Sequence, residues 1–381
     1  MVLFLHNRYR TTGGEERVVE DLMWLVRERL GEPVELLSRD SGELGKARAA
    51  LGLLRGGLDP EDVARAVRLT GARVLHAHNL NPALGWRALA AARAAGARVV
   101  LHLHQYRLVC AVGVCFTQGA ECTRCHGRDT LPGVRRNCRG SLPEALAYGA
   151  SLALWQQRLL AHADVVIAPS RFALERLREL GAPLPWERTH VLAPPVRALE
   201  EPRVGELQAG SYALLVSRLS PEKGVDVAID ACRIAGVALV VAGDGPERDA
   251  LRAHATRVGA EVRFAGRVGD GELSRLRAGA SIALVPSRSA ETFGAAAAEA
   301  MAAGLPVAAS AVGALPELLP AQALVPADQA PALAAAIARL AGDQAVGAEN
   351  RERVEALCAP EIVAAGLREL YDSPLARPGR T

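Results

Sequence analysis

Short apolar runs alternate with longer stretches of helical periodicity along the first half of the chain. The runs predict strands at residues 2–5, 74–78, 98–104 and 164–168. The helical periodicity predicts helices at residues 15–30, 86–95 and 171–180. Polar residues, several of them histidines, stand at the carboxyl ends of these strands. The alternation indicates a doubly wound parallel sheet, in which ligands bind at those strand ends.

The alternation stops around residues 193–209, where proline and glutamate accumulate, and this composition predicts a linker. Beyond it, strands are predicted at residues 212–217, 238–242, 262–266, 282–285 and 307–309. Helices are predicted at residues 225–235, 247–258 and 294–303, the last of them ending at Gly304. We therefore expect an α/β protein with two Rossmann-like, doubly wound parallel-sheet domains that face each other across a cleft.

The expected division has three parts. Residues 1–196 form an N-terminal domain, which includes the cysteine-rich stretch 110–138, and residues 205–358 form a C-terminal domain. Residues 359–381 form a last helix and tail, which we expect to return to the first domain through Ile362, Leu367 and Leu370.

Composition agrees with this class of fold. Half of the 381 residues are apolar and only 4% are aromatic, which favours helices on aliphatic parallel strands. The net charge of +3 is too small to indicate nucleic acid or an anionic membrane as a partner. The opening apolar run lacks the preceding basic residues of a signal peptide, and residues 145–154 are too few to span a bilayer. These features predict a cytoplasmic protein and leave open a peripheral contact at the inner face of the membrane.

Two cations lie just beyond the strand predicted at residues 212–217. Arg218 and Lys223 stand five residues apart, at a strand end and beside a helix start. Arginine grips two oxygens in a fork and lysine adds a point charge, so the pair suits a diphosphate. The alternative is an ordinary surface loop.

Two glutamates follow the strand predicted at residues 282–285. Glu291 is expected just before a helix, where the N–H groups of Phe293 and Gly294 face the same space, and Glu299 lies within that helix. Such a site offers amides to a negative group and a carboxylate to sugar hydroxyls. Alternatively, Glu291 interacts with the helix dipole and Glu299 is solvated.

A series of short motifs runs in order through residues 211–318. It comprises Arg218 with Lys223, Gly-Asp-Gly-Pro at 243–246, Phe-Ala-Gly at 264–266, Pro-Ser at 286–287, Glu291 through Glu299, and Gly-Leu-Pro-Val at 304–307. The series resembles the C-terminal domain of the family 4 retaining glycosyltransferases, which have the GT-B fold.

The resemblance implies a role for each of these positions. Arg218 and Lys223 neutralise the donor diphosphate, Glu291 holds hydroxyls of the donor sugar, and Glu299 holds the ribose. The implied donor-binding set comprises Gly13, Gly14, Gly243, Gly245, Thr292, Phe293, Gly294 and Glu299. Between Pro286 and Glu291 this chain departs from the family, and Arg288 there is either a third cation or points outward.

The N-terminal half resembles the same family less sharply. Gly13 and Gly14 resemble its glycine loop, and two glycines at a helix start permit close approach of a phosphate, although such a pair is often only a turn. His104 matches the histidine that the family places near the reacting sugar, with His76, His78 and His102 as competitors. A structural histidine is the alternative.

Five of the seven cysteines lie between Cys110 and Cys138. The C-x-x-C of Cys122 and Cys125, together with Cys110 and Cys138, supplies four thiolates for a possible structural zinc. Free or redox-active cysteines are the alternative, and disulfides are disfavoured in a reducing cytoplasm. Arginines outnumber acidic residues in this loop and either attract an anionic acceptor or are solvated.

The sequence therefore predicts a retaining glycosyltransferase that moves a sugar from a nucleotide-sugar donor to a hydroxyl acceptor. The acceptor is a sugar, a glycolipid or a polysaccharide of the cell envelope, and catalysis requires no cofactor. The expected catalytic residues are His104, Arg218, Lys223 and Glu291. A nucleotide-sugar epimerase or another GT-B enzyme is the first alternative. A nucleic-acid-binding protein with a zinc loop is disfavoured by the charge.

Overall fold

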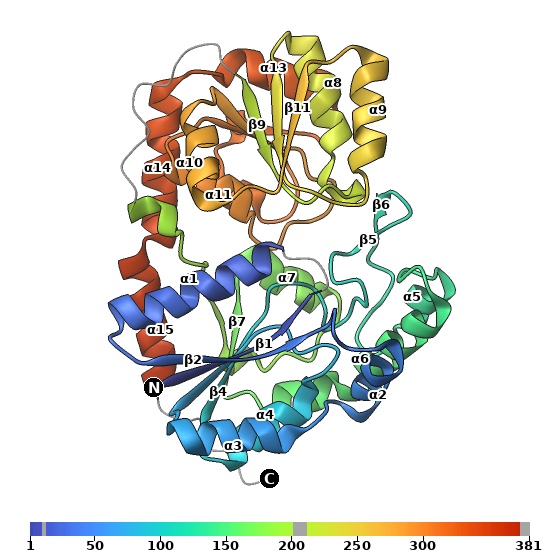
Figure 1. The fold of residues 1–381 in the computed structure, drawn as a ribbon, viewed down its shortest axis with the longest axis vertical. Coiled ribbons are helices and arrows are strands. Elements are labelled where there is room, and N and C mark those ends of the chain that lie inside the picture. Colours follow the sequence, from blue (N-terminus) through green and yellow to red (C-terminus); the bar gives the residue numbers. More distant parts are fainter. Residues whose placement is uncertain (10–12, 201–211, 374–381) are drawn as a thin grey trace. The chain divides into compact units, whose positions relative to one another are not determined.

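The computed structural model describes residues 1–9, 13–200 and 212–373 (Figure 1). The chain forms two compact units. The first comprises residues 1–115, 122–195 and 360–381, and the second comprises residues 116–121 and 196–359. Residues 201–209 of the predicted linker and the start of the domain predicted at 205–358 lie outside the described residues.

The first unit is built on a six-stranded parallel sheet with the order β2-β1-β3-β4-β7-β8. Its strands are β1 (Val2–Arg8), β2 (Val34–Asp40), β3 (Val74–Ala77), β4 (Arg98–His102), β7 (Val165–Ala168) and β8 (Thr189–Val191). Its helices are α1 (Gly14–Arg29), α2 (Lys46–Arg55), α3 (Pro60–Thr70), α4 (Gly85–Ala94), α5 (Leu131–Arg135), α6 (Leu142–Ala161), α7 (Arg171–Glu179) and α15 (Pro360–Asp372).

Helices cover both faces of this sheet, with α1 and α15 on one side and α3 and α4 on the other (Figure 1). The inner strands β3 and β7 are therefore buried along their whole length, and β7 has a continuous apolar sequence. β4 ends at His102 and not at His104 as predicted, although the N–H of Leu103 still donates to the carbonyl of Ile167 on β7 at 2.8 Å.

The last helix of the chain completes the core of the first unit. On α15, Val363, Leu367 and Tyr371 pack in one cluster with residues of α1 and of the sheet, among them Leu22 and Val100. Leu367 is fully buried and Leu370 is 8% exposed. Ile362, which we expected on the same face, is 47% exposed, because the buried positions of the helix follow the stripe through Val363 and Leu367.

The second unit has a six-stranded parallel sheet with the order β11-β10-β9-β12-β13-β14. Its strands are β9 (Ala213–Val216), β10 (Leu239–Ala242), β11 (Val262–Gly266), β12 (Ile282–Val285), β13 (Val307–Ser310) and β14 (Leu324–Val325). Its helices are α8 (Val225–Ala235), α9 (Arg248–Val258), α10 (Asp270–Ala278), α11 (Ala295–Ala302), α12 (Leu315–Leu318), α13 (Ala330–Leu340) and α14 (Gln344–Cys358).

The segment around the five clustered cysteines contains little regular structure. It holds the hairpin of β5 (Phe116–Thr117) and β6 (Ala120–Glu121), and the short helix α5. The apolar segment noticed at residues 145–154 is the middle of α6. Within the described part of the chain, the structure contains no helix with the length and apolarity that crossing a membrane requires.

The packing of α15 leads to a first prediction. Replacing Leu367 by Ala should lower the free energy of unfolding by about 2–5 kcal/mol, because the change opens a cavity in a fully buried cluster. Replacing the exposed Ile362 by Ala on the same helix should change it by less than about 1 kcal/mol. Urea denaturation followed by circular dichroism measures both. Equal losses in the two variants would contradict the packing described here.

Candidate active site

The strand order of the second unit determines where a ligand can bind. From β9 the chain runs outward through β10 to β11 and then returns to build β12, β13 and β14 on the other side. The crevice at such a switch point, above the ends of β9 and β12, is where doubly wound sheets bind ligands. The loops that follow these two strands carry Arg218, Lys223 and Glu291.

Lys223 and Glu291 meet across this switch point. Nζ of Lys223 donates to Oε1 of Glu291 at 2.7 Å, and the Ser287 hydroxyl donates to the same oxygen at 2.5 Å. Burial alone raises the pKa of Glu291, but Lys223 and the Ser287 hydrogen bond outweigh it and lower the pKa below its ordinary value. Glu291 is therefore a carboxylate at neutral pH, able to accept hydrogen bonds from hydroxyl groups.

Arg218 is held by residues of its own loop. Its guanidinium forms an ion pair with Glu222, and its Nε donates to the Ser220 hydroxyl at 3.2 Å. Ser220 donates in turn to Glu222 at 2.7 Å. Burial raises the pKa of Glu222, but the Ser220 hydrogen bond and the charge of Arg218 lower it overall. The Arg218 side chain remains 46% exposed, so part of the positioned guanidinium is open to a ligand.

Arg288 ties the two loops to the rest of the second unit. Its guanidinium donates to the Asp226 carboxylate at 2.8 and 2.6 Å and also forms an ion pair with Asp328. Its backbone N–H donates to the carbonyl of Glu222 at 2.8 Å. Arg288 therefore does not point outward, and it is not an unpaired third cation. Its ion pairs with Asp226 and Asp328 hold the loop after β12 in place.

Glu299 has a partner that the sequence did not indicate. On α11 it forms an ion pair with Nη2 of Arg277, which lies on α10 and is 5% exposed. A buried guanidinium without a charged partner is strongly destabilising, so Glu299 neutralises Arg277 in addition to any contact with a ligand.

Gly243 and Gly245 stand where the loop after β10 passes the end of β9. Gly243 has φ +139°, and a Cβ there would lie 1.8 Å from the carbonyl oxygen of Ser217. At Gly245 a Cβ would lie 2.3 Å from the carbonyl oxygen of Leu219. The space that a Cβ would fill at these glycines is occupied by backbone of the Arg218 loop. Their expected contact with a nucleotide stays a prediction.

The backbone of Glu291 is fixed by the loop that follows β13. The N–H of Ala314 donates to the carbonyl of Glu291 at 2.8 Å. Gly313 adopts φ +61°, and a Cβ there would lie only 2.2 Å from the amide nitrogen of Glu291. Gly313 was not among the predicted residues, and the only available signal was a glycine a few positions beyond a strand.

The segment between Glu291 and α11 contains three further predicted donor residues, namely Thr292, Phe293 and Gly294. The helix begins at Ala295, one residue later than expected, with Gly294 as its N-cap in the left-handed region at φ +98°. Phe293 is 7% exposed and anchors the segment. Thr292, Phe293 and Gly294 therefore connect the Glu291 carboxylate to the start of the helix.

The first unit gathers histidines at the carboxyl ends of β1, β3 and β4. The ring of His104 stacks on that of His102 with centroids 4.7 Å apart, and its Nε2 lies 2.8 Å from Nδ1 of His78. Burial lowers the pKa of His104 more than the nearby carboxylate of Glu15 raises it. His104 is therefore neutral at pH 7 and can exchange hydrogen bonds with a sugar hydroxyl without supplying a positive charge.

The predicted glycine loop begins α1. Gly13 is its N-cap, and its N–H donates to Oε2 of Glu16 at 2.8 Å. A Cβ on Gly14 would meet no atom within 4 Å, and both glycines are exposed. The start of α1 is thus open, and Glu16 already satisfies one of its amides. Residues 10–12 lie outside the described residues.

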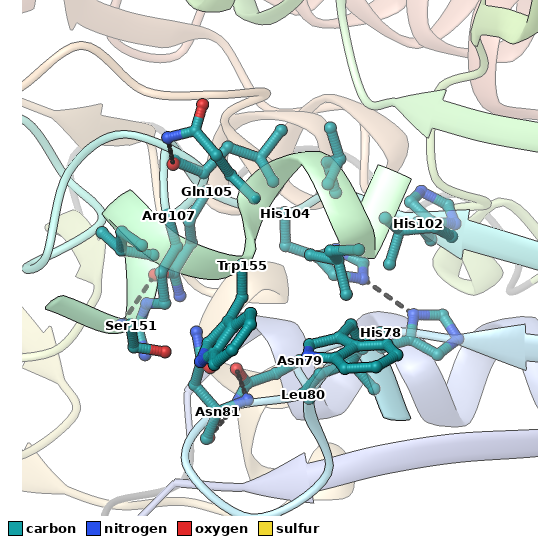
Figure 2. A pocket seen from close by; sticks show the side chains of 18 of the residues that line it. His78, Asn79, Leu80, Asn81, His102, His104, Gln105, Arg107, Ser151 and Trp155 are labelled. Carbon is teal, nitrogen blue, oxygen red and sulfur yellow. Dashed lines mark hydrogen bonds between the residues drawn. The ribbon is translucent and has the colours of Figure 1, made fainter. Parts of the chain in front are cut away.

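A pocket opens beside His104, within the first unit (Figure 2). Its polar lining includes Glu15, His78, Asn79, His104, Gln105 and Arg107, and its apolar lining includes Leu80, Trp86, Leu152 and Trp155. Nε2 of Gln105 donates to Glu15 at 3.0 Å, and Arg107 donates to Oε1 of Gln105 at 3.0 Å. Aromatic faces beside linked polar groups suit a carbohydrate or another amphipathic ligand.

All seven cysteines are free thiols. Cys110 hydrogen-bonds to Cys115, which lowers the pKa of Cys110 to about 6, while burial raises the pKa of Cys125 to about 11. Among the described residues, the only side chains whose ligand atoms group closely enough for a metal are histidines. Among the described residues, the sulfur atoms of Cys110, Cys122, Cys125 and Cys138 are not gathered in that way, and the zinc site at these residues stays a prediction.

Two family models match the chain. The model described as a glycosyl transferase 4-like domain matches residues 11–195, and the model described as glycosyl transferases group 1 matches residues 200–356.

Curated relatives match over shorter stretches. A Mycobacterium tuberculosis protein named GDP-mannose-dependent alpha-(1-6)-phosphatidylinositol dimannoside mannosyltransferase is 34% identical over 191 residues, 46% of this chain and 48% of that protein. The phosphatidyl-myo-inositol mannosyltransferase of the same species is 37% identical over 144 residues, 35% and 38% of the two chains. The chain thus spans about half the length of the curated relatives it matches, or less.

Solved structures match over nearly the whole length. Sucrose-phosphate synthase from Thermosynechococcus elongatus superposes with a TM-score of 0.70 at 20% identity, covering 97% of this chain and 98% of that one. The Anabaena protein HepE, in a structure with UDP and glucose, gives a TM-score of 0.68 at 20% identity over 98% and 99% of the two chains.

Two Rossmann-like units with these strand orders define the GT-B class of glycosyltransferase folds. The two family models together cover most of the chain. The protein belongs to the group 1 glycosyltransferases of family 4.

The contact between Gly313 and Glu291 leads to a second prediction. Gly313→Ala should weaken nucleotide binding and destabilise the fold by more than Gly304→Ala. Both glycines have positive φ, so each variant carries about 1–2 kcal/mol of backbone strain, but only Gly313 abuts the Glu291 backbone. Urea denaturation and calorimetric titration with UDP or GDP measure the two effects. Equal losses of stability and of nucleotide affinity in the two variants would show that Gly313 does not contribute to the site.

Proposed function

We propose that the chain is a retaining glycosyltransferase that transfers a sugar from a nucleotide-sugar donor to a hydroxyl group. The observation that carries this proposal is the Lys223–Glu291 pair at the switch point of the second unit. It places a cation and an ionised carboxylate at 2.7 Å from each other, on the loops where such a sheet binds its ligand.

In this proposal the cations bind the diphosphate of the donor. The Arg218 guanidinium is positioned by Glu222, and the Lys223 side chain is 26% exposed. Together they offset the charge that develops on the leaving nucleoside diphosphate, which is an electrostatic contribution to the rate. Glu291 accepts hydrogen bonds from hydroxyls of the donor sugar, and Glu299 contacts the ribose while it remains paired with Arg277.

The acceptor binds in the pocket of the first unit. Its tryptophans offer a face to a sugar ring, while Gln105 and Arg107 offer hydrogen bonds to hydroxyl or anionic groups. His104 orients a hydroxyl group at this pocket as a neutral imidazole.

The chemical step proceeds on one face of the donor sugar. The bond from the anomeric carbon to the phosphate oxygen breaks, and the acceptor oxygen forms its new bond on the same face. The acceptor proton passes to the departing phosphate oxygen. Arg218, Lys223 and helix amides stabilise the leaving group, so the proposal requires no catalytic cofactor.

The acceptor belongs to cell-envelope polysaccharide or glycolipid synthesis. Two relatives carry names that specify GDP-mannose or a phosphatidylinositol acceptor, which makes GDP-mannose and a glycolipid the first pair to test. Exposed leucines on α5 and α6, at Leu131, Leu142, Leu146 and Leu154, would support a peripheral contact with the inner face of the membrane. Free cysteines fit the reducing cytoplasm that this location implies.

Glu291→Ala supplies the direct test. It should lower kcat/KM for transfer by about 100-fold or more while leaving the far-ultraviolet circular dichroism unchanged, because a charged group of the site is lost. Glu352→Ala, at an exposed position of α14 in the same unit, is the matched control and should retain activity.

The assay screens UDP-, GDP- and ADP-sugars with and without an acceptor, and nuclear magnetic resonance identifies the anomer formed. Full activity of Glu291→Ala would refute the site assignment. Conversion of the donor into an epimer in the absence of an acceptor would refute sugar transfer and support epimerase activity.

A further inference from the structure

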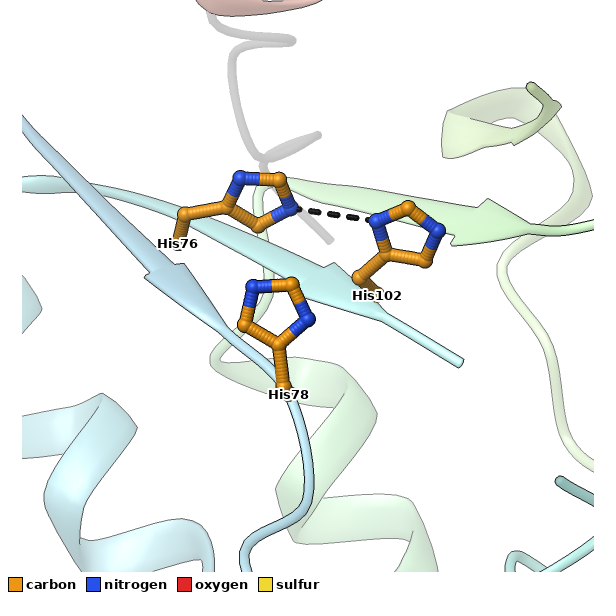
Figure 3. Close-up of side chains that lie close together, drawn as sticks. All are labelled: His76, His78 and His102. Atoms are coloured by element: carbon orange, nitrogen blue, oxygen red, sulfur yellow. Dashed lines mark hydrogen bonds between the residues drawn. The ribbon is translucent and has the colours of Figure 1, made fainter. Parts of the chain in front are cut away.

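Three histidines of the first unit lie together beneath the pocket. His76 and His78 extend from β3 and its end, and His102 is the last residue of β4 (Figure 3). Each is at least nine-tenths buried, and each offers one ring nitrogen such that all three nitrogens lie within 4.8 Å of one another. The proposed transfer reaction uses His104 and gives these three residues no task.

The buried imidazoles have nitrogens that no protein group satisfies. Nε2 of His78 and Nε2 of His102 are buried without a hydrogen-bond partner in the described structure. His76 Nε2 lies 3.2 Å from His102 Nδ1, so one of these two nitrogens carries a proton and the other accepts it. Nε2 of His78 is thus left as an unused donor or an unused lone pair in the same cluster. A buried polar group without a partner destabilises the fold.

The opposite sides of two rings are already engaged. Nδ1 of His76 lies 2.7 Å from the Tyr371 hydroxyl on α15, and Nδ1 of His78 lies 2.8 Å from Nε2 of His104. Histidines that bind metal ions typically use one ring nitrogen as the ligand while the other is hydrogen-bonded to an outer partner. Tyr371 and His104 occupy those outer positions.

We infer that His76, His78 and His102 form a binding site for a divalent transition-metal ion of the zinc class. The site is separate from the cysteine loop and from the donor residues of the second unit. Neutral imidazoles are good ligands for Zn²⁺ and poor ligands for Mg²⁺ or Ca²⁺, which prefer oxygen.

The distances fit this chemistry. In a tetrahedral site with Zn–N bonds of about 2.0–2.1 Å, neighbouring nitrogens lie about 3.3 Å apart. His76 Nε2 and His102 Nδ1 are 3.2 Å apart, so a metal ion can replace the proton that they share. The His78 ring is stacked on His76 with centroids 4.5 Å apart, and its ligand nitrogen lies within 4.8 Å of those of the other two histidines.

Two of the three histidines, His78 and His102, also line the pocket of the first unit, so a bound ion would lie at its inner wall.

Metal titration of the purified full chain tests the proposal. Protein with Cys122→Ser and Cys125→Ser is stripped with a chelator and titrated with Zn²⁺ and Co²⁺, which removes the main thiolate competitor. We expect one equivalent of metal to bind, a rise in Tm, and a visible Co²⁺ spectrum without a sulfur-to-cobalt charge-transfer band. Mg²⁺ should give no binding.

Single substitutions assign the ligands. His102→Gln and His78→Gln should abolish saturable binding, while Tyr371→Phe should weaken it by about 10–100-fold, as loss of an outer partner does. His190→Gln, at an exposed histidine on β8 of the same sheet, is the matched control and should bind one equivalent. Circular dichroism establishes that each variant is folded.

Two results would overturn the site. One is less than stoichiometric binding by the folded cysteine variant, and the other is unchanged binding by folded His102→Gln. If the cysteine variant does not fold, the wild-type Co²⁺ spectrum decides. A band of nitrogen ligation that disappears in His102→Gln supports the site, and a spectrum of thiolate ligation alone excludes it.

Discussion

Strand β9 pairs with β10 on one side and with β12 on the other, and the chemistry of the second unit depends on this pairing. Because the chain leaves β9 and β12 toward opposite edges of the sheet, neither loop can close over the other strand end. The gap that results is bounded by Lys223 on one loop and by Glu291 on the other. Their ion pair joins the two loops, and Gly313 fixes the backbone of Glu291 from a third. The proposed donor site is thus built from loops that the sheet brings together, and no single loop forms it.

Much of this arrangement could be predicted from the sequence, because buried parallel strands and amphipathic helices have distinct periodicities. The predictions failed where burial is partial. β2 is half-exposed along most of its length and has the mixed sequence VELLSRD, so its pattern did not indicate a strand. Ile362 lies one residue from the buried stripe of α15, a distinction that a short helix pattern does not resolve.

Contacts between distant segments could not be predicted from the sequence, for a different reason. In the sequence, Arg277 does not differ from the other arginines of its charged helix. The fold places it beside Glu299, which is 22 positions away in the sequence. The motif drew attention to the two turn glycines after β10, but the atoms that leave no room for a Cβ there belong to the backbone of the Arg218 loop. Motifs therefore indicated the candidate residues, while the residues that contact them could be identified only from the structure. The roles assigned to these residues stay predictions.

The two units accommodate buried polar side chains in different ways. The second unit sets charged pairs at its strand ends and between α10 and α11, and each carboxylate is balanced by a nearby cation. The first unit stacks neutral imidazoles at the equivalent ends of its strands and leaves some of their nitrogens without a protein partner. The last helix, α15, reaches this cluster through Tyr371. Since residues 196–359 are synthesised before α15, a ribosome releases nearly the whole second unit before the first can close its core. The part of the first unit that precedes residue 196 is therefore synthesised before the second unit, yet it is completed only when α15 packs against the cluster that contains Leu22 and Val100.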